Sequence, residues 1–153
     1  MVKLIAGEAK SRNARYGIIV SAFNEFITQR LLEGCLDELK KCGVKDKDIT
    51  VVRVPGAFEI PLVAEKLARR KNIHAVICLG AVIRGETIHF DIVAENAGRG
   101  ILQAGLATGK PVILGVITTD TVKQAYARSS KKDHKGRDAA RAAVEMVNTL
   151  RKI

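Results

Sequence analysis

The chain has 153 residues, 47% of them hydrophobic and 27% charged, enough to bury an aliphatic core in one domain spanning residues 1–153. No stretch approaches the ~18 consecutive apolar residues of a membrane span, and the first residues lack the apolar run of a signal peptide. We therefore expect neither a membrane anchor nor a secretion leader. Because Cys35, Cys42 and Cys78 have no C-x-x-C spacing, we expect buried, reduced thiols and a cytoplasmic protein.

The net charge of +10 is concentrated near one end of the chain. Residues 122–153 contain nine Lys or Arg against three Asp or Glu. Three interpretations remain open, namely a nucleic-acid partner, a solvated basic helix and a site for an anionic substrate. Tyr126 is the only aromatic residue in this segment, so the side chains that stack on bases are nearly absent. This composition disfavours nucleic acid.

Short β-branched runs alternate with stretches of helical spacing along the whole chain. In the first of these helical stretches, apolar residues recur on one face and Gly43 is placed to end the helix. Pro61 is compatible with the second helix only in its first turn. Asp120 or Thr121 is the expected N-cap of the fourth. We expect strands at 16–21, 49–54, 74–83 and 109–118, and helices at 25–43, 58–71, 88–108, 120–129 and 137–150.

The strands are almost continuously apolar and are separated by helices. This pattern is typical of a parallel sheet that is covered on both faces. The sequence therefore predicts a flavodoxin-like three-layer α/β/α sandwich with a central four-stranded parallel sheet. The additional apolar run VKLIAG at residues 2–7 is either an edge strand of this sheet or a segment that pairs with a neighbouring subunit.

Polar, aromatic and glycine residues gather where the predicted strands end. The stretches are SAFNE (21–25), PGAFE (55–59), GAVIRGETIH (80–89) and TTDT (118–121). Open parallel sheets bind ligands at the carboxyl ends of their strands. The sequence therefore predicts an enzyme or ligand-binding site at this edge of the sheet.

The stretch RGETIHFD (84–91) joins a buried strand to a helix. Gly85, Glu86 and Thr87 would present free backbone N–H groups and a hydroxyl at the positive end of that helix, which suits a phosphate. An ordinary threonine N-cap has the same sequence signature. Because a carboxylate repels phosphate, we expect Glu86 to contribute its backbone and to turn its side chain away.

Three further side chains at this edge have two interpretations each. His89 is either a surface residue at a helix start or a proton shuttle, since a histidine titrates near neutral pH. Phe23 and Phe58 are ordinary core residues if taken singly. As a pair at the end of the sheet, they would enclose a flat heterocycle.

Other combinations of polar residues have simpler explanations. Asp91, Glu95 and Arg99 follow at intervals of four residues, which predicts a solvated ladder of ion pairs. His74 and Cys78 would share one face of a buried strand, so we reject them as metal ligands and expect no metal.

Five blocks of the sequence together resemble the 6,7-dimethyl-8-ribityllumazine synthase family, the penultimate enzymes of riboflavin biosynthesis. The most specific parts are PGAFEIP (55–61) and IRGET (83–87), and the resemblance covers about residues 10–150. The blocks are SAFNEFITQRLLEGCLDEL, VPGAFEIPLVAEKLA, GAVIRGETIHFDIVA, GVITTDTVKQAYAR and HKGRDAARAAVEM, in this order.

The resemblance implies a transferase that needs no cofactor. Members condense 5-amino-6-(D-ribitylamino)uracil with 3,4-dihydroxy-2-butanone 4-phosphate and release phosphate and water. It implies that His89 transfers protons and that Glu86, Thr87 and Arg128 hold the phosphorylated substrate, with Lys135 as a further candidate. The residues implied for the ribitylaminouracil are Phe23, Ala57, Phe58, Glu59, Ala81, Val82, Ile83 and Leu114.

The chain departs from the family pattern at two places. Leu114 stands where many members carry Phe, which removes an aromatic contact near the heterocycle. The usual NKG is HKG at 134–136, and the preceding loop SSKKD (129–133) is short and lacks the common glycine.

The resemblance also implies partners. Besides the two small-molecule substrates, it implies a homopentamer with active sites between subunits, and the short connection between the last two helices resembles members in which twelve pentamers form a 60-subunit shell. Riboflavin synthase is a candidate partner. Two other functions stay open, a flavin- or lumazine-binding module without turnover and a basic nucleic-acid binder.

Overall fold

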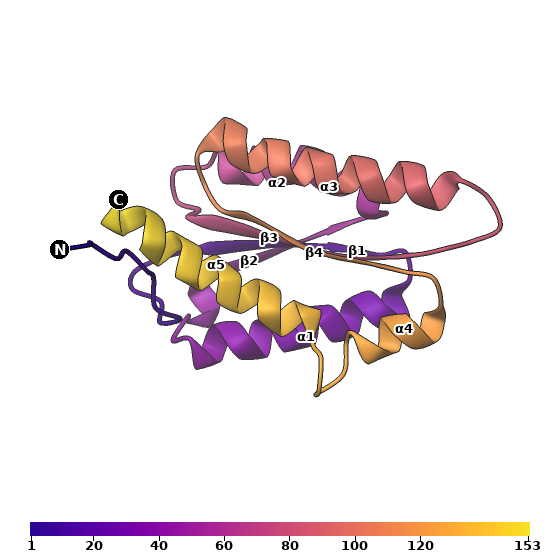
Figure 1. Cartoon of the computed structure of the whole chain (residues 1–153), viewed down its shortest axis with the longest axis horizontal. Helices are drawn as coiled ribbons and strands as arrows, with labels where there is room; N and C mark the ends of the chain where they lie inside the picture. The colour runs from indigo at the N-terminus through magenta and orange to yellow at the C-terminus, as the bar shows by residue number, and fades with distance from the viewer.

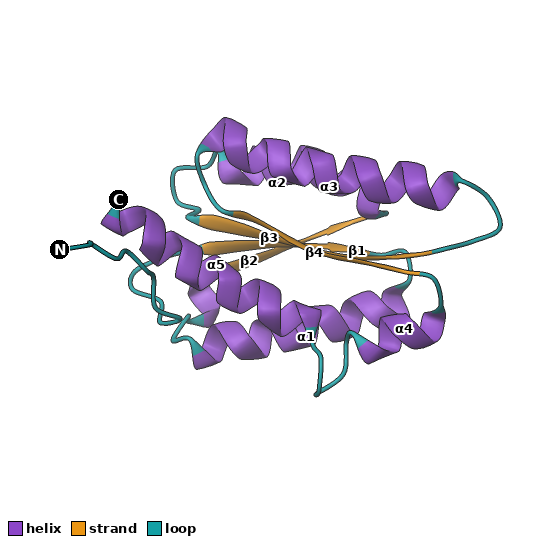
Figure 2. Ribbon diagram, in the orientation of Figure 1, coloured by secondary structure: helices purple, strands orange, loops and turns teal.

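A computed structural model describes all residues, 1–153, and contains one four-stranded parallel sheet in the order β2-β1-β3-β4. Two helices cover one face of the sheet and three cover the other (Figures 1 and 2). The predicted flavodoxin-like α/β/α sandwich is therefore confirmed. The strands are β1 (Tyr16–Ser21), β2 (Ile49–Val54), β3 (Ala75–Ile83) and β4 (Val112–Thr119); the helices are α2 (Ile60–Ala68) and α3 (His89–Thr108) on one face, and α1 (Glu25–Lys41), α4 (Val122–Ala127) and α5 (Lys135–Lys152) on the other.

The two central strands, β1 and β3, supply most of the core. Because successive side chains of a strand point to opposite faces, Ile18 and Ile77 pack in the layer with α1 and α5, whereas Ile19 and Val76 pack in the layer with α2 and α3. All four side chains are fully buried, and each contributes about 1.5–3 kcal/mol of hydrophobic free energy. This double burial explains why these strands are almost continuously apolar.

The helix ends follow the signals in the sequence. Gly43 adopts φ 88° directly after α1, a left-handed conformation that favours glycine, and Pro61 lies in the first turn of α2. Thr121, rather than Asp120, is the N-cap of α4, and its hydroxyl accepts a hydrogen bond of 3.1 Å from the Gln124 N–H. These helix ends agree with the alternation of strands and helices along the chain. In the parallel sheet, that alternation brings the carboxyl ends of all four strands to the same edge.

The N-terminal residues 1–8 form no strand, so the prediction of an edge strand within this chain is wrong. Side chains of α5 bind this segment instead. The Thr149 hydroxyl accepts from the Gly7 N–H at 3.0 Å, and the Asn148 amide donates to the Glu8 carbonyl at 2.7 Å. Both chain ends therefore lie at the same end of the molecule (Figure 1).

The three cysteines are free and buried, as predicted. Burial raises the pKa of Cys35 to about 12 and also raises that of Cys78. Separately, no helix in the structure has both the length and the apolar character that crossing a membrane requires.

Candidate active site

A cavity of about 670 Å³ opens at the carboxyl edge of the sheet, where the sequence predicts a site. The loops after β1, β2 and β3, the end of β3 and the start of α3 form it. All seven residues predicted for the ribitylaminouracil before β4 line this cavity, and so do Thr87 and His89. The lining residues are Phe23, Asn24, Pro55, Gly56, Ala57, Phe58, Glu59, Ala81, Val82, Ile83, Gly85, Thr87, His89, Phe90, Ile92 and Val93.

Backbone hydrogen bonds fix the loops of the cavity to one another. The Phe23 N–H donates to the Pro55 carbonyl at 2.9 Å, which ties the loop after β1 to the loop after β2. Asn24, in the left-handed conformation with φ 59°, donates its side-chain amide to the Ala81 carbonyl at 2.9 Å. One asparagine thus connects the loop after β1 to strand β3. Asn24 stands in the predicted stretch SAFNE, but its side chain was not predicted as a site residue.

Two exposed aromatic side chains and three residues of β3 line the cavity. Phe23 and Phe58 are 71% and 55% exposed, so neither is a core residue. Exposed aromatic rings that line a cavity mark a binding surface, because leaving them in water forfeits hydrophobic free energy. Ala81 and Val82 are buried, so they offer mainly backbone atoms to a ligand.

The loop before α3 carries the predicted phosphate-binding residues. Helix α3 begins at His89, and its N-cap is Ile88, which has no side-chain capping bond. The interpretation of Thr87 as an ordinary N-cap is therefore wrong. The Thr87 hydroxyl instead accepts a long hydrogen bond of 3.4 Å from the His89 N–H. The exposed Glu86 side chain makes no hydrogen bond or ion pair and does not line the cavity.

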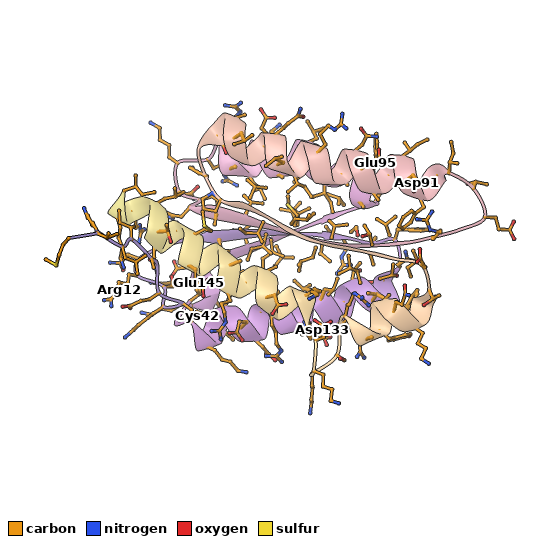
Figure 3. The ribbon with its side chains drawn as sticks, in the orientation of Figure 1. Arg12, Cys42, Asp91, Glu95, Asp133 and Glu145 are labelled. Atoms are coloured by element: carbon orange, nitrogen blue, oxygen red, sulfur yellow. The ribbon has the colours of Figure 1, made fainter.

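Arg84 and Asp91 form structural ion pairs. The Arg84 guanidinium binds Asp120 at 2.8 Å and Asp91 at 3.4 Å, joining the ends of β3 and β4 to α3. The predicted ladder from Asp91 through Glu95 to Arg99 is wrong, since no ion pair joins these residues. Asp91 has Arg84 as its partner, and exposed pairs on a helix are worth only about 0.2–0.5 kcal/mol. Figure 3 shows Asp91 and Glu95 along α3.

Leu114, Arg128 and Lys135 do not lie in this cavity. They line a separate groove of about 380 Å³ between the edge strand β4 and the start of α5. Lys135 pairs there with Asp133 at 2.9 Å and with Asp138 at 3.6 Å. The hydrogen bond to Asp133 and the charges of both carboxylates raise the pKa of Lys135. In a single chain, the predicted site is thus split between two surfaces.

The short helix α4 and the loop after it position Arg128. Its backbone N–H bonds the Gln124 carbonyl at 3.1 Å, and its carbonyl accepts from the Lys135 N–H at 2.9 Å. His134 caps α5 by accepting from the Arg137 N–H at 3.3 Å. The two cations of the groove therefore flank one short loop, whose two ends are hydrogen-bonded to each other.

Three apolar side chains of α3 also belong to the cavity but were not predicted. Phe90, Ile92 and Val93 line its wall. Their helical spacing resembles that of core residues, so no pattern in the sequence indicated that they face a ligand site. Elsewhere, no group of three or more His, Cys, Asp or Glu side chains is arranged to hold a metal ion. His74 and Cys78 do not converge on one, since His74 Nδ1 accepts from the Arg15 N–H and Cys78 is fully buried.

A parallel α/β sandwich with an open aromatic cavity at its carboxyl edge belongs to the doubly wound class of proteins, which bind small molecules at this edge. Residues 13–151 match the family described as 6,7-dimethyl-8-ribityllumazine synthase. The chain belongs to this family, as the resemblance predicted.

Two relatives with the name of this family match the chain over nearly its whole length. The chain is 52% identical over 154 residues to 6,7-dimethyl-8-ribityllumazine synthase of Syntrophus aciditrophicus (strain SB), with 100% of both chains covered. It is 52% identical over 151 residues to 6,7-dimethyl-8-ribityllumazine synthase of Desulfotalea psychrophila (strain LSv54 / DSM 12343), covering 98% of this chain and 97% of the relative. The likeness therefore extends over the whole fold and both surfaces of the split site.

Proposed function

We propose that this chain condenses 5-amino-6-(D-ribitylamino)uracil with 3,4-dihydroxy-2-butanone 4-phosphate to form 6,7-dimethyl-8-ribityllumazine, acting as one domain over residues 1–153. The observation that carries this proposal is the meeting, in one cavity, of an exposed aromatic pair, backbone groups of β3 and His89. Its family membership supplies the identity of the substrates.

The aromatic part of the cavity suits the ribitylaminouracil. Phe23 and Phe58 offer ring faces to the flat pyrimidine, and Ala81, Val82 and Ile83 offer backbone N–H and carbonyl groups to its edge. Ala57 and Glu59 lie beside Phe58, where the Glu59 carboxylate and the backbone would hold the ribityl hydroxyls. Polar recognition of this kind fixes orientation, while the rings supply the buried area.

The loop before α3 suits the phosphate of the second substrate. The backbone of Gly85 and Glu86 and the Thr87 hydroxyl precede the start of α3, where the N-cap Ile88 makes no side-chain capping bond and the His89 N–H has only its long bond of 3.4 Å to the Thr87 hydroxyl. Arg128 adds a guanidinium, whose planar donors match phosphate oxygens better than an ammonium does. Lys135 is a further contact if it releases its two carboxylate partners.

His89 is the proposed proton donor and acceptor. The amine of one substrate attacks the ketone of the other to give a carbinolamine and then an imine; phosphate leaves by elimination, and the ring closes with loss of a second water. Each step moves a proton, which one imidazole at the cavity wall can carry. The substrate amine is the nucleophile, so the protein needs none. Orienting two substrates together contributes up to about 7–11 kcal/mol.

The split of the site supports a shared active site in a homopentamer. Arg128, Leu114 and Lys135 lie on the β4 groove, whereas His89 and Phe23 lie in the main cavity, so a neighbouring subunit would supply the groove. Leu114 is 58% exposed on an edge strand, as expected for a side chain that a partner covers.

A mixed-oligomer experiment tests the shared site. His89→Ala and Arg128→Ala chains are each expected to have little activity alone. Refolding or co-expressing the two together should restore activity, since some sites then combine an intact His89 with an intact Arg128 of the neighbour. Activity of the mixture no higher than that of the separate variants would show that both residues act within one chain.

The short loop between α4 and α5 supports assembly of twelve pentamers into a 60-subunit shell. Analytical ultracentrifugation would show a single large particle, and a particle of pentamer mass would refute the shell. We also propose a cytoplasmic location, on the basis of the three free thiols, and riboflavin synthase as a partner, to be tested by co-sedimentation with the particle.

The direct test is a product assay. Mixing the two substrates with the protein should produce lumazine absorbance faster than the spontaneous reaction. A rate equal to the spontaneous one would refute the synthase. Tight ligand binding without turnover would point to a binding module instead.

A further inference from the structure

A second cavity, of about 650 Å³, lies at the opposite edge of the sheet, where the strands begin. Three segments form it, and each directly precedes a strand: residues 11–15 precede β1, residues 43–48 precede β2, and His74 precedes β3. Figure 3 shows Arg12 and Cys42 at this end of the molecule and Asp91 at the other. The reaction proposed above uses none of these residues.

The lining of this amino-edge cavity is strongly basic. Its only acid, Asp48, already pairs with Arg15 at 3.4 Å. Lys45 and Lys47 make no ion pair, and Arg12 reaches only Glu8, at 3.9 Å. A concave surface with unbalanced charge focuses the electric field toward a ligand of opposite charge. The cations of the lining are Arg12, Arg15, Lys45 and Lys47.

Helix dipoles do not explain these cations. Helices α1 and α5 end at this edge, and the negative ends of their dipoles are matched by basic residues in their last turns. Those residues are Lys40, Lys41, Arg151 and Lys152. Arg12, Arg15 and Lys45 lie in loops and Lys47 lies in a single 3₁₀ turn (Asp46–Asp48), all outside those last turns, so their accumulation needs another reason.

The backbone that carries the arginines is held in place before any ligand binds. The Arg15 N–H donates to His74 Nδ1 at 2.9 Å, and the His74 N–H donates to the Arg15 carbonyl at 2.8 Å. The Arg151 guanidinium donates to the carbonyls of Arg12 and Asn13, and Asn13 adopts the left-handed φ of 48°. A loop fixed from both sides loses little conformational entropy on binding.

His74 adds a neutral donor to this cavity. Because Nδ1 accepts a hydrogen bond, the ring proton lies on Nε2, which makes no hydrogen bond within the protein. Burial, followed by the charges of Arg151 and Lys110, lowers the pKa of His74 and keeps the ring neutral near pH 7. The Nε2–H is thus free to bind an acceptor atom.

We propose that the amino-edge cavity binds an oligophosphate group, two or more linked phosphates, either as a free anion or as part of a nucleotide. The cavity is larger than one orthophosphate, and it has more cations, at separate positions, than one orthophosphate can contact. No Phe, Tyr or Trp side chain lines it, so it offers no large stacking platform for a base and recognises the phosphates themselves. The proposal rests on the geometry of this edge and is independent of the synthase reaction.

Isothermal titration with inorganic triphosphate tests the proposal. The titration uses Arg128→Gln protein, so that the phosphate site of the proposed synthase reaction does not contribute. In this background, Lys45→Gln/Lys47→Gln should raise the Kd for triphosphate roughly tenfold or more, since two charge-assisted contacts are lost. The matched control, Lys66→Gln/Lys71→Gln, removes two other cations that make no ion pair and should change Kd by less than about twofold. Rising salt should weaken binding in the parent protein.

Other arms of the experiment identify the source of the phosphates and can overturn the proposal. Equal affinities for pyrophosphate and ADP support recognition of the phosphates alone, and tighter binding of ADP supports a nucleotide as the source.

Equal losses in the two double variants, or a triphosphate signal that disappears with Arg128→Gln alone, would overturn the proposal. Single-stranded RNA that binds far more tightly than triphosphate through Lys45 and Lys47 would replace it with a nucleic-acid surface. Lumazine formation by Lys45→Gln/Lys47→Gln with Arg128 intact should stay at the parent rate.

Discussion

The two edges of the sheet carry cavities of nearly equal size, about 670 Å³ at the carboxyl edge and 650 Å³ at the amino edge, but with opposite chemistry. The carboxyl-edge cavity is lined mainly by apolar and aromatic side chains and contains no Lys or Arg. The amino-edge cavity contains four cations and only two apolar residues. Because one sheet supports both, the difference comes from the loops and from the helix ends that accompany them.

Helix direction explains much of this contrast. Helices begin at the carboxyl edge, where free N–H groups attract anions without any charged side chain. Helices end at the amino edge, where carbonyl groups repel anions, so an anion site there requires cationic side chains. The proposed synthase site also extends beyond this cavity, because Arg128 lies on the separate β4 groove. The amino-edge cavity is built entirely from this chain.

The largest expected effect is on kcat, and it distinguishes His89 at the carboxyl edge from His74 at the amino edge. His89→Ala should lower kcat by about 10²–10⁴-fold with a modest loss of substrate binding, because the proton carrier is lost while the binding walls remain. The control is His74→Gln at the amino edge, which should leave kcat unchanged. Steady-state lumazine formation measures both, and an unchanged rate in His89→Ala would remove this residue from its proposed role.

The next effect separates two arginines. Arg128→Gln should raise KM for the phosphorylated substrate about tenfold or more and leave KM for the ribitylaminouracil nearly unchanged, since the guanidinium is proposed to contact only the phosphate. Arg12→Gln, which removes a guanidinium from the other edge, is the control and should leave both constants unchanged. Equal increases in KM for both substrates would argue that Arg128 supports the fold of the site rather than the phosphate.

The carboxyl edge was largely predictable from the sequence, and the reason is physical. Apolar periodicity fixes the strands and helices, and parallel topology places all strand ends together, so Phe23, Phe58 and His89 could be assigned to one cavity. The separation of Arg128 from them was not evident, because spacing along the chain does not say on which side of β4 a loop lies. Expecting a shared site required the family resemblance.

Other features depend on distances that periodicity cannot supply. The apolar N-terminal run was expected either as an edge strand or as a segment that pairs with a neighbouring subunit; within the chain it forms no strand, and hydrogen bonds with Asn148 and Thr149 of α5 hold it. The ion pair of Asp91 with Arg84 replaced the expected helical ladder for the same reason. The amino-edge cavity was not predicted, since its cations are far apart in the chain and belong to no motif.

A smaller effect concerns the response of the amino edge to pH. The folded-state pKa of His74 is lowered from 6.5, so the unfolded chain takes up a proton that the folded protein resists. The contribution of His74 to the free energy of unfolding is therefore fully present above about pH 6.5 and is lost as the pH falls toward the folded-state pKa. His134 has the same sign, because burial and then Arg137 lower its pKa.

Urea unfolding at pH 7.5 and 5.5 measures this response. The midpoint should fall at the lower pH, and His74→Gln should reduce the fall, since Gln has no proton to take up. His89→Gln at the carboxyl edge is the matched control and should keep the full fall. If the midpoint of His74→Gln falls as much at pH 5.5 as that of the parent protein, His74 is not a source of the pH dependence.

The smallest expected effect compares two buried hydroxyls beneath the carboxyl edge. Ser21 Oγ, at the end of β1, is buried without a hydrogen-bond partner, whereas the Thr28 hydroxyl donates to the Ser21 carbonyl at 2.7 Å. Ser21→Ala removes an unsatisfied polar atom and should leave the free energy of unfolding unchanged or raise it by up to about 1 kcal/mol. Thr28→Val keeps the shape but leaves the carbonyl unpaired, which should cost about 1–3 kcal/mol. Equal losses in the two variants, measured by urea unfolding at pH 7.5, would mean that the Ser21 hydroxyl has a hydrogen-bond partner in solution.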